Sequence, residues 1–239
     1  MIAEEAVIET DLAMGAEEVP CAKDEAEQWG VKNHYGYRIV KRLFDIVFST
    51  GVLIVLLVPA LILCVAIRIE SPGNPIFVQH RVARMGKEGK IRTFPMLKFR
   101  SMYKDAESRL EELKDLNEAD GPLFKIKDDP RVTRIGRFIR RHSIDEMPQF
   151  LNCWLGQMST CGPRPAFLRE VEYYSKRDML RLSVKPGITG YWQIRGRSDT
   201  SFEEMIQFDL EYIEEQSYFS DIKIILKTIG VVFTGNGAW

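Results

Sequence analysis

The sequence predicts a helix-rich, membrane-associated protein in which an apolar segment near the N-terminus enters a bilayer and returns, followed by one globular domain. Three observations lead to this fold class. The charge is divided unevenly along the chain, a long run of residues has no charge, and short extended and helical patterns alternate after that run. We find no internal repeat and no second domain in the pattern.

The charge distribution separates an acidic leader from a basic body. The 239 residues have a formal net charge of −1, which by itself indicates no partner. Residues 1–29 contain nine acids and one base, whereas the remaining residues contain 32 bases and 25 acids. A basic body suits an anionic partner such as a nucleotide, a nucleic acid or an anionic lipid. We expect residues 1–36 to form a mobile leader rather than a signal peptide.

A run of 22 uncharged residues, Ile46–Ile67, is long enough to cross the hydrocarbon core of a bilayer, about 30 Å thick. Pro59 lies inside it and removes a backbone hydrogen bond. Basic residues flank both ends, and the positive-inside rule places both flanks in the cytoplasm. These bases are Arg38, Lys41, Arg42, Arg68, Arg81, Arg84 and Lys87. We therefore predict a re-entrant helix–break–helix over residues 37–70; the alternative is a tilted single span kinked at Pro59.

Residues 76–100 predict short strands around a glycine turn, with Lys98 and Arg100 on one face and Phe99 on the other. Leucine spacing predicts an amphipathic helix from Lys104 to Glu118. Four cysteines without CxxC spacing indicate buried or idle thiols, not a zinc site or a disulfide framework.

A basic helix is expected from Arg131 to Arg141, with one face turned either to solvent or to lipid headgroups. It leads to two adjacent carboxylates, Asp145 and Glu146. Ser143 predicts the N-cap of the next helix, with Glu146 completing a Ser-x-x-Glu capping box. Acids in a first turn can simply complement the helix dipole. Alternatively, they can attack an electrophile or hold a metal ion.

Arginine and glycine patterns downstream suggest anion binding. The prolines of Gly162-Pro163-Arg164-Pro165 restrict the backbone around Arg164, which favours either a fixed guanidinium or a plain loop. Residues 183–199 form a Gly-rich stretch with three bases, which could wrap a phosphate or be a series of turns. In the helix that Ser201 and Glu204 are expected to cap, Asp209 lies on the apolar stripe. Such a carboxylate should meet an arginine or a metal.

These motifs together resemble the monotopic phosphoglycosyl transferases, the bacterial sugar transferases that act on undecaprenyl phosphate. The resemblance runs from about Lys41 to the C-terminus. The matching segments, in chain order, are KRLFDIVFS, SPGNPIFVQHRV, LKFRSM, DDPRVTRIGRFIRRHSIDEMPQFLN, GPRP, KPGITGYWQIRGRS and FDLEYI. It implies a helix-rich α/β fold with a re-entrant membrane helix, interfacial amphipathic helices and a small cytoplasmic globule, here residues 71–239.

The resemblance implies a covalent mechanism at the cytoplasmic face of the bacterial inner (plasma) membrane. Asp145 would attack the β-phosphorus of a UDP-sugar, UMP would leave, and undecaprenyl phosphate would take the phosphosugar. Glu146 would hold Mg²⁺, and Arg140 and Arg164 would bind phosphate. Further candidate phosphate- or substrate-binding residues are Lys98, Arg100, Gln193, Arg197 and Asp209. Membrane phospholipid is an expected partner, nucleic acid is not, and a homodimer is left open.

The chain departs from the family pattern at Gln157, where the family usually has Asp, at Thr160 and Cys161, where it has apolar residues, and at Ala83, where Gly is common. These departures leave open an alternative, a catalytically inactive membrane adaptor of a polysaccharide assembly complex. The sequence does not identify the sugar.

Overall fold

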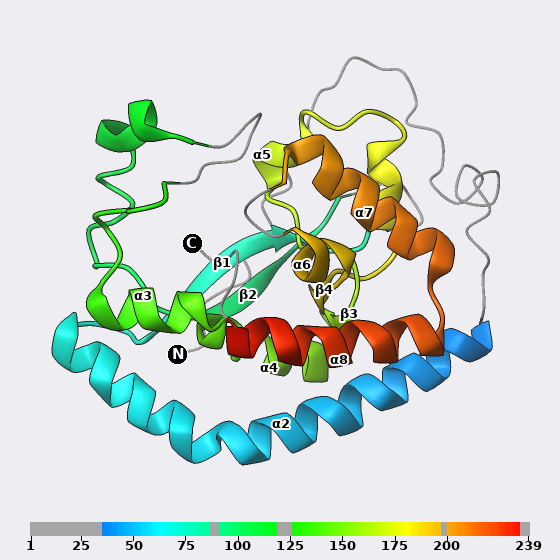
Figure 1. Cartoon of the computed structure of the whole chain (residues 1–239), viewed down its shortest axis with the longest axis horizontal. Helices are drawn as coiled ribbons and strands as arrows, with labels where there is room; N and C mark the ends of the chain where they lie inside the picture. Colours follow the sequence, from blue (N-terminus) through cyan, green and yellow to red (C-terminus); the bar gives the residue numbers. More distant parts are fainter. Residues whose placement is uncertain (1–34, 87–90, 119–125, 197–199, 235–239) are drawn as a thin grey trace.

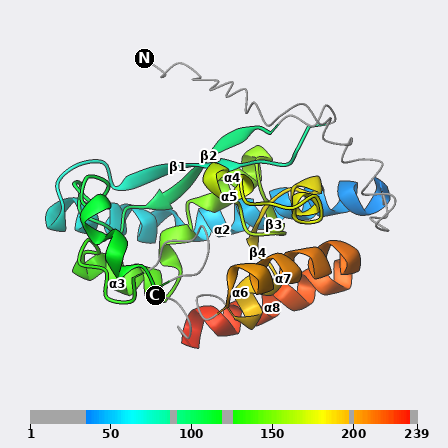
Figure 2. The same cartoon turned by 90° about the horizontal axis from the view of Figure 1, so that it is seen from above.

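The computed structural model describes residues 35–86, 91–118, 126–196 and 200–234. A small globule of short helices and two small sheets lies against one long helix, α2 (Figures 1 and 2). The elements are α2 Tyr35–Glu70, β1 Ile76–Val82, β2 Thr93–Phe99, η1 Glu111–Leu116, α3 Arg134–Arg141, η2 Ile144–Glu146, α4 Gln149–Leu155, β3 Ser159–Cys161, α5 Leu168–Val171, η3 Asp178–Ser183, β4 Gly187–Thr189, α6 Tyr191–Arg195, α7 Phe202–Glu215 and α8 Tyr218–Thr234. The acidic leader lies outside the described residues except for Tyr35 and Gly36.

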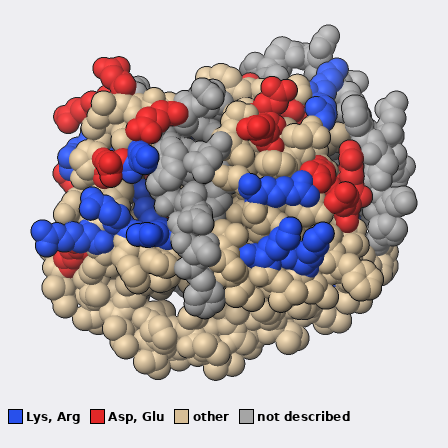
Figure 3. Space-filling model, in the orientation of Figure 1, with Lys and Arg blue, Asp and Glu red and all other residues tan. Residues whose placement is uncertain are grey.

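Helix α2 is long and apolar enough to cross a membrane, and its most apolar stretch is almost entirely uncovered by the protein. The prediction that the helix is interrupted at Pro59 is wrong, because α2 continues through this residue. The helix is instead bent near its middle (Figure 1), and a proline inside a helix is a common cause of bending. Figure 3 shows no Lys, Arg, Asp or Glu along the lower rim, which α2 forms.

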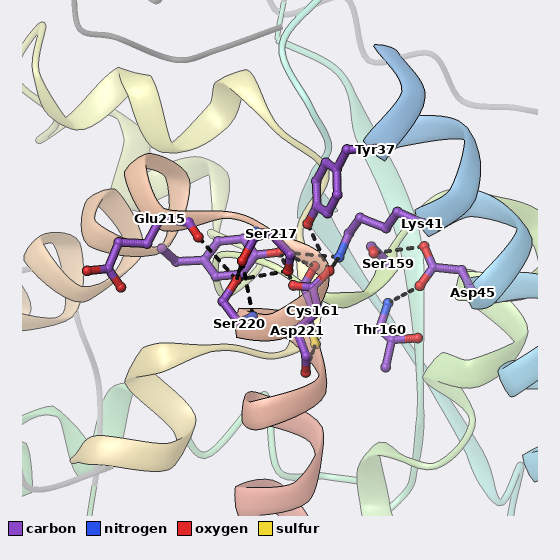
Figure 4. A network of polar contacts seen from close by, with 11 residues as sticks. Tyr37, Lys41, Asp45, Ser159, Thr160, Cys161, Glu215, Ser217, Ser220 and Asp221 are labelled. Atoms are coloured by element: carbon purple, nitrogen blue, oxygen red, sulfur yellow. Dashed lines mark hydrogen bonds and ion pairs between the residues drawn. The ribbon is translucent and has the colours of Figure 1, made fainter. Parts of the chain in front are cut away.

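The first turns of α2 are fixed to the globule by buried polar contacts (Figure 4). Lys41 Nζ lies 2.6 Å from Asp221 Oδ2 of α8, and the Tyr37 hydroxyl donates to the same oxygen at 2.8 Å. Asp45 is buried and accepts from the Thr160 amide and the Ser159 hydroxyl of β3, both at 2.8 Å. Buried charges need such partners. Lys41 and Asp45, the first and last residues of KRLFD, therefore attach α2 to the globule.

The last residue of α2 is attached to the same globule. The two carboxylate oxygens of Glu70 accept from the backbone amides of Arg134, at 2.8 Å, and Ile135, at 3.0 Å. These amides open α3, where an acid is favourable because the first N–H groups of a helix have no partner within the helix. Both ends of α2 are therefore attached to one body.

Strands β1 and β2 form the predicted antiparallel hairpin, with Phe77 opposite Lys98 and Arg81 opposite Phe94. Opposite residues share a face, so Arg81 and Lys98 lie on the same face of the hairpin. Phe99 is buried on the other face. The glycine turn predicted between the two strands falls largely on residues 87–90, which lie outside the described residues.

The second sheet is a short parallel pair, β3 and β4, covered by α7 and α8. Its glycines allow close approach of two backbones, since a Cβ on Gly187 or Gly190 would overlap the backbone of Gly162. The described part of the Gly-rich stretch is thus mainly β4 and α6 rather than one continuous loop, and whether it meets a phosphate stays a prediction.

The helix predicted from Lys104 to Glu118 is also wrong. Residues 104–110 form turns, and a 3₁₀ helix follows from Glu111 to Leu116. Leu110 and Leu113 are only half-buried and Leu116 is 54% exposed, so the leucines of the pattern are incompletely packed. Short helices gain most of their stability from such packing.

Candidate active site

Asp145 and Glu146 lie in the 3₁₀ turn η2, between α3 and α4. The prediction that Ser143 caps a helix is wrong: its side chain makes no cap hydrogen bond, and its φ is 53°. The left-handed conformation and the 3.0 Å bond from the Ser143 amide to the Arg140 carbonyl are typical of the residue that ends a helix. Ser143 thus terminates α3, and α4 begins only at Gln149, after Pro148.

The basic helix is shorter than predicted. It begins at Arg134, with the Thr133 side chain accepting from the Gly136 amide at 2.8 Å. Arg131 lies before it and is buried against Asp129, with Nη2 2.7 Å from Oδ2. This pairing removes Arg131 from the exposed basic face.

Asp145 is buried beside cations. Lys98 Nζ lies 3.0 Å from Glu146 Oε1, and Arg140 Nε donates to the Ser101 hydroxyl at 2.8 Å. Burial raises the pKa of Asp145 to about 6; Lys98 opposes this shift, the adjacent Glu146 adds to it, and Arg140 opposes it. A buried carboxylate that has a raised pKa and lies near cations is a candidate nucleophile or base.

Arg164 belongs to a second cluster of charges. Its Nη1 lies 3.1 Å from Oε2 of Glu170, a residue with no exposed surface. The guanidinium also lies near two rings, 5.9 Å from the centre of Phe167 and 5.6 Å from that of Trp192. The fixed guanidinium expected from the two flanking prolines is therefore present.

Asp209 meets an arginine, which is one of the two partners that its inward position predicts. Its carboxylate pairs with Arg181, and both side chains are fully buried. Although burial alone would lower the pKa of Arg181, the Asp209 carboxylate raises it overall. Arg181 also donates to the Arg164 carbonyl at 3.0 Å, and the Arg164 amide donates to Asp209 at 3.4 Å. In the structure, Asp209 therefore holds the backbone of Arg164.

The other predicted binding residues are distributed differently. Arg100 lies just beyond β2, and its guanidinium donates to the Ser71 carbonyl at the end of α2, so it does not share the surroundings of Lys98. Gln193 lies in α6 and donates to the Ile188 carbonyl at 3.4 Å. Arg197 lies outside the described residues.

Sequence reasoning missed three residues that organise the arginine cluster: Arg81, Glu170 and Arg181. For Arg81, the alternation of side chains along β1 is a local signal, because it places Arg81 on the face opposite Val82. Glu170 and Arg181 have no such signal, because their partners come from other elements.

The carboxylates allow a divalent cation, although the described residues include no group of three potential metal ligands. Mg²⁺ is commonly held by one or two carboxylates together with substrate phosphates and water. Asp145 and Glu146 are adjacent and could supply such oxygens. The bond from Lys98 occupies only one direction at Glu146 Oε1. The residues therefore fit a magnesium ion that a diphosphate helps to bind.

The departure at Gln157 fits its surroundings. Its Oε1 accepts from Asn152 at 2.6 Å, and Asn152 also bonds the backbone of β2 at Pro95 and Leu97. Thr160 and Cys161 are buried in β3, which precedes the segment that carries Arg164. The departures therefore leave both charged clusters assembled.

Residues 36–235 match the family model described as bacterial sugar transferase. The chain therefore belongs to the bacterial sugar transferases. It is 47% identical over 207 residues to a galactosyl transferase, CpsE, of Streptococcus agalactiae, covering 85% of this chain and 44% of the relative. It is 42% identical over 212 residues to the UDP-glucose:undecaprenyl-phosphate glucose-1-phosphate transferase of Escherichia coli, covering 84% and 42%.

A shorter relative matches over most of its own length. The exopolysaccharide production protein ExoY of Rhizobium meliloti is 38% identical over 205 residues, covering 84% of this chain and 88% of the relative. The chain thus spans less than half of the two longer relatives and nearly all of ExoY.

Proposed function

We propose that this protein transfers a sugar 1-phosphate from a UDP-sugar to undecaprenyl phosphate, the first step of exopolysaccharide or related glycan assembly. The observation that carries the proposal is Asp145, buried beside Lys98 and Arg140 in a protein with an uncovered apolar helix. The names of its relatives, which include lipid-carrier and undecaprenyl-phosphate transferases, support the lipid acceptor.

In the first half-reaction, a carboxylate oxygen of Asp145 attacks the β-phosphorus of the donor. A bond forms between that oxygen and phosphorus, the bond from phosphorus to the bridging oxygen breaks, and UMP leaves with the bonding electrons. Arg140 and Lys98 reduce the repulsion between the carboxylate and the diphosphate. A bound Mg²⁺, held by Glu146 and the donor phosphates, would supply further charge neutralisation.

In the second half-reaction, a phosphate oxygen of undecaprenyl phosphate attacks the same phosphorus. The bond to Asp145 breaks, which restores the carboxylate and gives undecaprenyl diphosphate sugar. Dividing the transfer into two steps lets a soluble donor and a lipid acceptor use one nucleophile in turn. Arg164 is suited to bind a donor phosphate, because its guanidinium is held by Glu170 and lies near two aromatic rings.

We further propose that α2 is re-entrant and that the globule lies on the cytoplasmic face of the bacterial inner membrane. A 36-residue helix is about 54 Å long if straight, more than a bilayer core. Lys41 and Glu70, near its two ends, contact one globule, which supports entry and return on the same side. Exposed apolar side chains on α8, among them Phe219 and Leu226, suit a helix lying at the interface.

The test is UMP release by purified, detergent-solubilised protein with Mg²⁺ and undecaprenyl phosphate, across a panel of UDP-sugars. We expect release with UDP-glucose, UDP-galactose or an N-acetylated relative, and none with D145N. Arg177, an exposed residue that bonds Gln207, provides the matched control R177Q, which should keep full turnover. Full turnover by D145N would refute the aspartyl mechanism.

No observation in the described residues favours the alternative of an inactive adaptor. Asp145 and Glu146 are present, as are Arg140 and Arg164, and the relatives above are named as transferases. Binding of UDP-sugar by folded protein without UMP release, across the whole panel, would be the result that returns attention to it.

A further inference from the structure

Arg81, the sixth residue of β1, is a buried cation that the reaction described above does not use. Its side chain belongs to a residue only 6% exposed. The guanidinium donates through Nη1 to the Pro165 carbonyl at 2.9 Å, and through Nε and Nη2 to Gln79 Oε1 at 3.0 and 2.8 Å. It also stacks on Phe167, 3.2 Å from the ring centre. The side chain is thus held on three sides.

The charge of Arg81 is not neutralised by a directly bonded carboxylate among the described residues, whereas Arg164 and Arg181 each have one. Burial lowers the pKa of Arg81 well below its ordinary value, and the cation Arg164 lowers it further. Glu170 and Glu146 act in the opposite direction. Arg81 therefore lies within electrostatic reach of the acidic turn as well as of the arginine cluster. Burying a cation that has no bonded carboxylate costs free energy, and a bound anion would offset that cost.

The segment that carries Arg164 is held by its carbonyl groups, one after another. The Gly187 amide donates to Pro163, the Arg181 guanidinium to Arg164, the Arg81 guanidinium to Pro165 and the Val82 amide to Ala166, at 2.8–3.0 Å. Of these four donors, two are backbone amides and two are arginine side chains. Arg181 has Asp209 as its own anion, so Arg81 is the donor that leaves a positive charge in the site.

We infer that Arg81 is a positioning residue of the donor site: it fixes Pro165 and Phe167 so that Arg164 meets the diphosphate. This inference rests on the proposed function. The anion to be bound is the diphosphate of a nucleoside diphosphate sugar. Its negative charge would offset the excess of cations that Arg81 leaves.

A merely structural role is the competing interpretation, because Arg81 also packs on Phe167. The positioning role and the structural role differ in whether the effect of replacing Arg81 depends on the presence of Arg164. If Arg81 acts by positioning Arg164, replacing both should cost little more than replacing Arg164 alone. If Arg81 only stabilises the fold, the losses should be independent, and they should follow the fraction of folded protein.

The experiment is a double-mutant cycle with R81M, R164M and the double variant, measured as the KM for the UDP-sugar and kcat at saturating undecaprenyl phosphate. We expect R81M to raise the donor KM about 10–100-fold with a smaller change in kcat. In the R164M background, the same change should raise KM less than about 3-fold. Thermal unfolding of each variant reports whether it is folded.

R81K keeps the charge but not the fork of donors, and it serves if R81M does not fold. It should raise the donor KM about 3–10-fold, between wild type and R81M. R177M, at the exposed residue Arg177, is the matched control and should leave KM unchanged. An unchanged donor KM in folded R81K or R81M, or independent losses in the cycle, would overturn the inference alone. Absence of turnover by folded wild type with every donor would overturn the proposed function and this inference with it.

Discussion

The acidic turn, Asp145–Glu146, and the arginine cluster around Glu170 and Asp209 both bury carboxylates, but in different ways. In the turn, one lysine contacts Glu146, whose side chain is 35% exposed, and burial raises the pKa of Asp145 to about 6. In the cluster, Glu170 and Asp209 are at most 1% exposed, and each pairs with its own arginine. The first region keeps Asp145, the proposed nucleophile, incompletely neutralised, while the second uses its acids to hold arginines in place.

This difference separates reactivity from positioning. An acid with a complete set of partners is stable and unreactive, whereas an acid held at a cost can gain stability by bonding to phosphorus. Changes in the acidic turn should therefore act on turnover, and changes in the cluster should act on stability and donor binding.

The largest expected effect on turnover is that of D145N. We expect a loss of at least about 1,000-fold, because the amide cannot form the covalent bond. Membrane association should survive, since α2 and α8 are unchanged. Sedimentation with membranes together with UMP release measures both, and residual turnover within about 10-fold of wild type would contradict the assignment.

D145N should also stabilise the protein in the absence of Mg²⁺ and donor. The pKa of Asp145 lies above its ordinary value of 3.8, so the cost of its charge is absent well below pH 4 and complete above about pH 6. At neutral pH, the variant should gain about 1–3 kcal/mol in the free energy of unfolding. Thermal unfolding at pH 4 and 7.5 tests this, because the gain should be several times larger at the higher pH.

The largest expected loss of stability comes from the cluster. D209A leaves the buried Arg181 without its anion and should cost about 3–5 kcal/mol. Denaturant unfolding measures the change. E146Q, at a half-exposed carboxylate, is the comparison and should change stability by less than about 1 kcal/mol. Equal losses in the two variants would remove the distinction between the regions.

The pH dependence of turnover reports the same asymmetry. Asp145 must be ionised to attack, so kcat/KM should fall about tenfold per pH unit below about pH 6. Lys98 lowers the pKa of Asp145, so K98M should move the acidic midpoint to higher pH. The midpoint of the rate profile is the readout, and a midpoint that does not move in K98M would show that another group titrates.

The smallest effects concern two helix caps, one beside each region. Thr133 caps α3, which leads to the acidic turn, and Ser201 caps α7, which carries Asp209. T133A and S201A should each cost about 1 kcal/mol. Thermal unfolding compares them. A loss several times larger in one variant would show that its cap supports more than its own helix.

Local patterns predicted much of this arrangement. The helical stripe placed Asp209 inward, alternation predicted the β1–β2 hairpin, and the Ser201–Glu204 capping box is present. Ser143 shows where such reasoning fails. Its capping-box pattern is intact, but the residue is needed to end α3, only two positions after Arg141. One residue could not serve both helices, and Pro148 delays the second.

Partnerships across the chain could not be predicted from the sequence alone. Arg181 and Asp209 are 28 residues apart, and Arg81 and Pro165 are 84 apart, so only the packed fold brings them together. The glycines of residues 183–199 suggested a phosphate loop, yet Gly187 and Gly190 serve the close approach of β4 to Gly162. The number of glycines indicated that small residues are required here, but not that the reason is close packing of two backbone segments.

The central claim is that Asp145 becomes covalently linked to the phosphosugar. The direct measurement is mass spectrometry of the protein after incubation with its UDP-sugar and Mg²⁺ without undecaprenyl phosphate. We predict a sugar phosphate on the peptide containing Asp145, a burst of UMP no larger than the amount of enzyme, and neither in D145N. Turnover in the presence of undecaprenyl phosphate, without any such adduct or burst in its absence, would contradict the account.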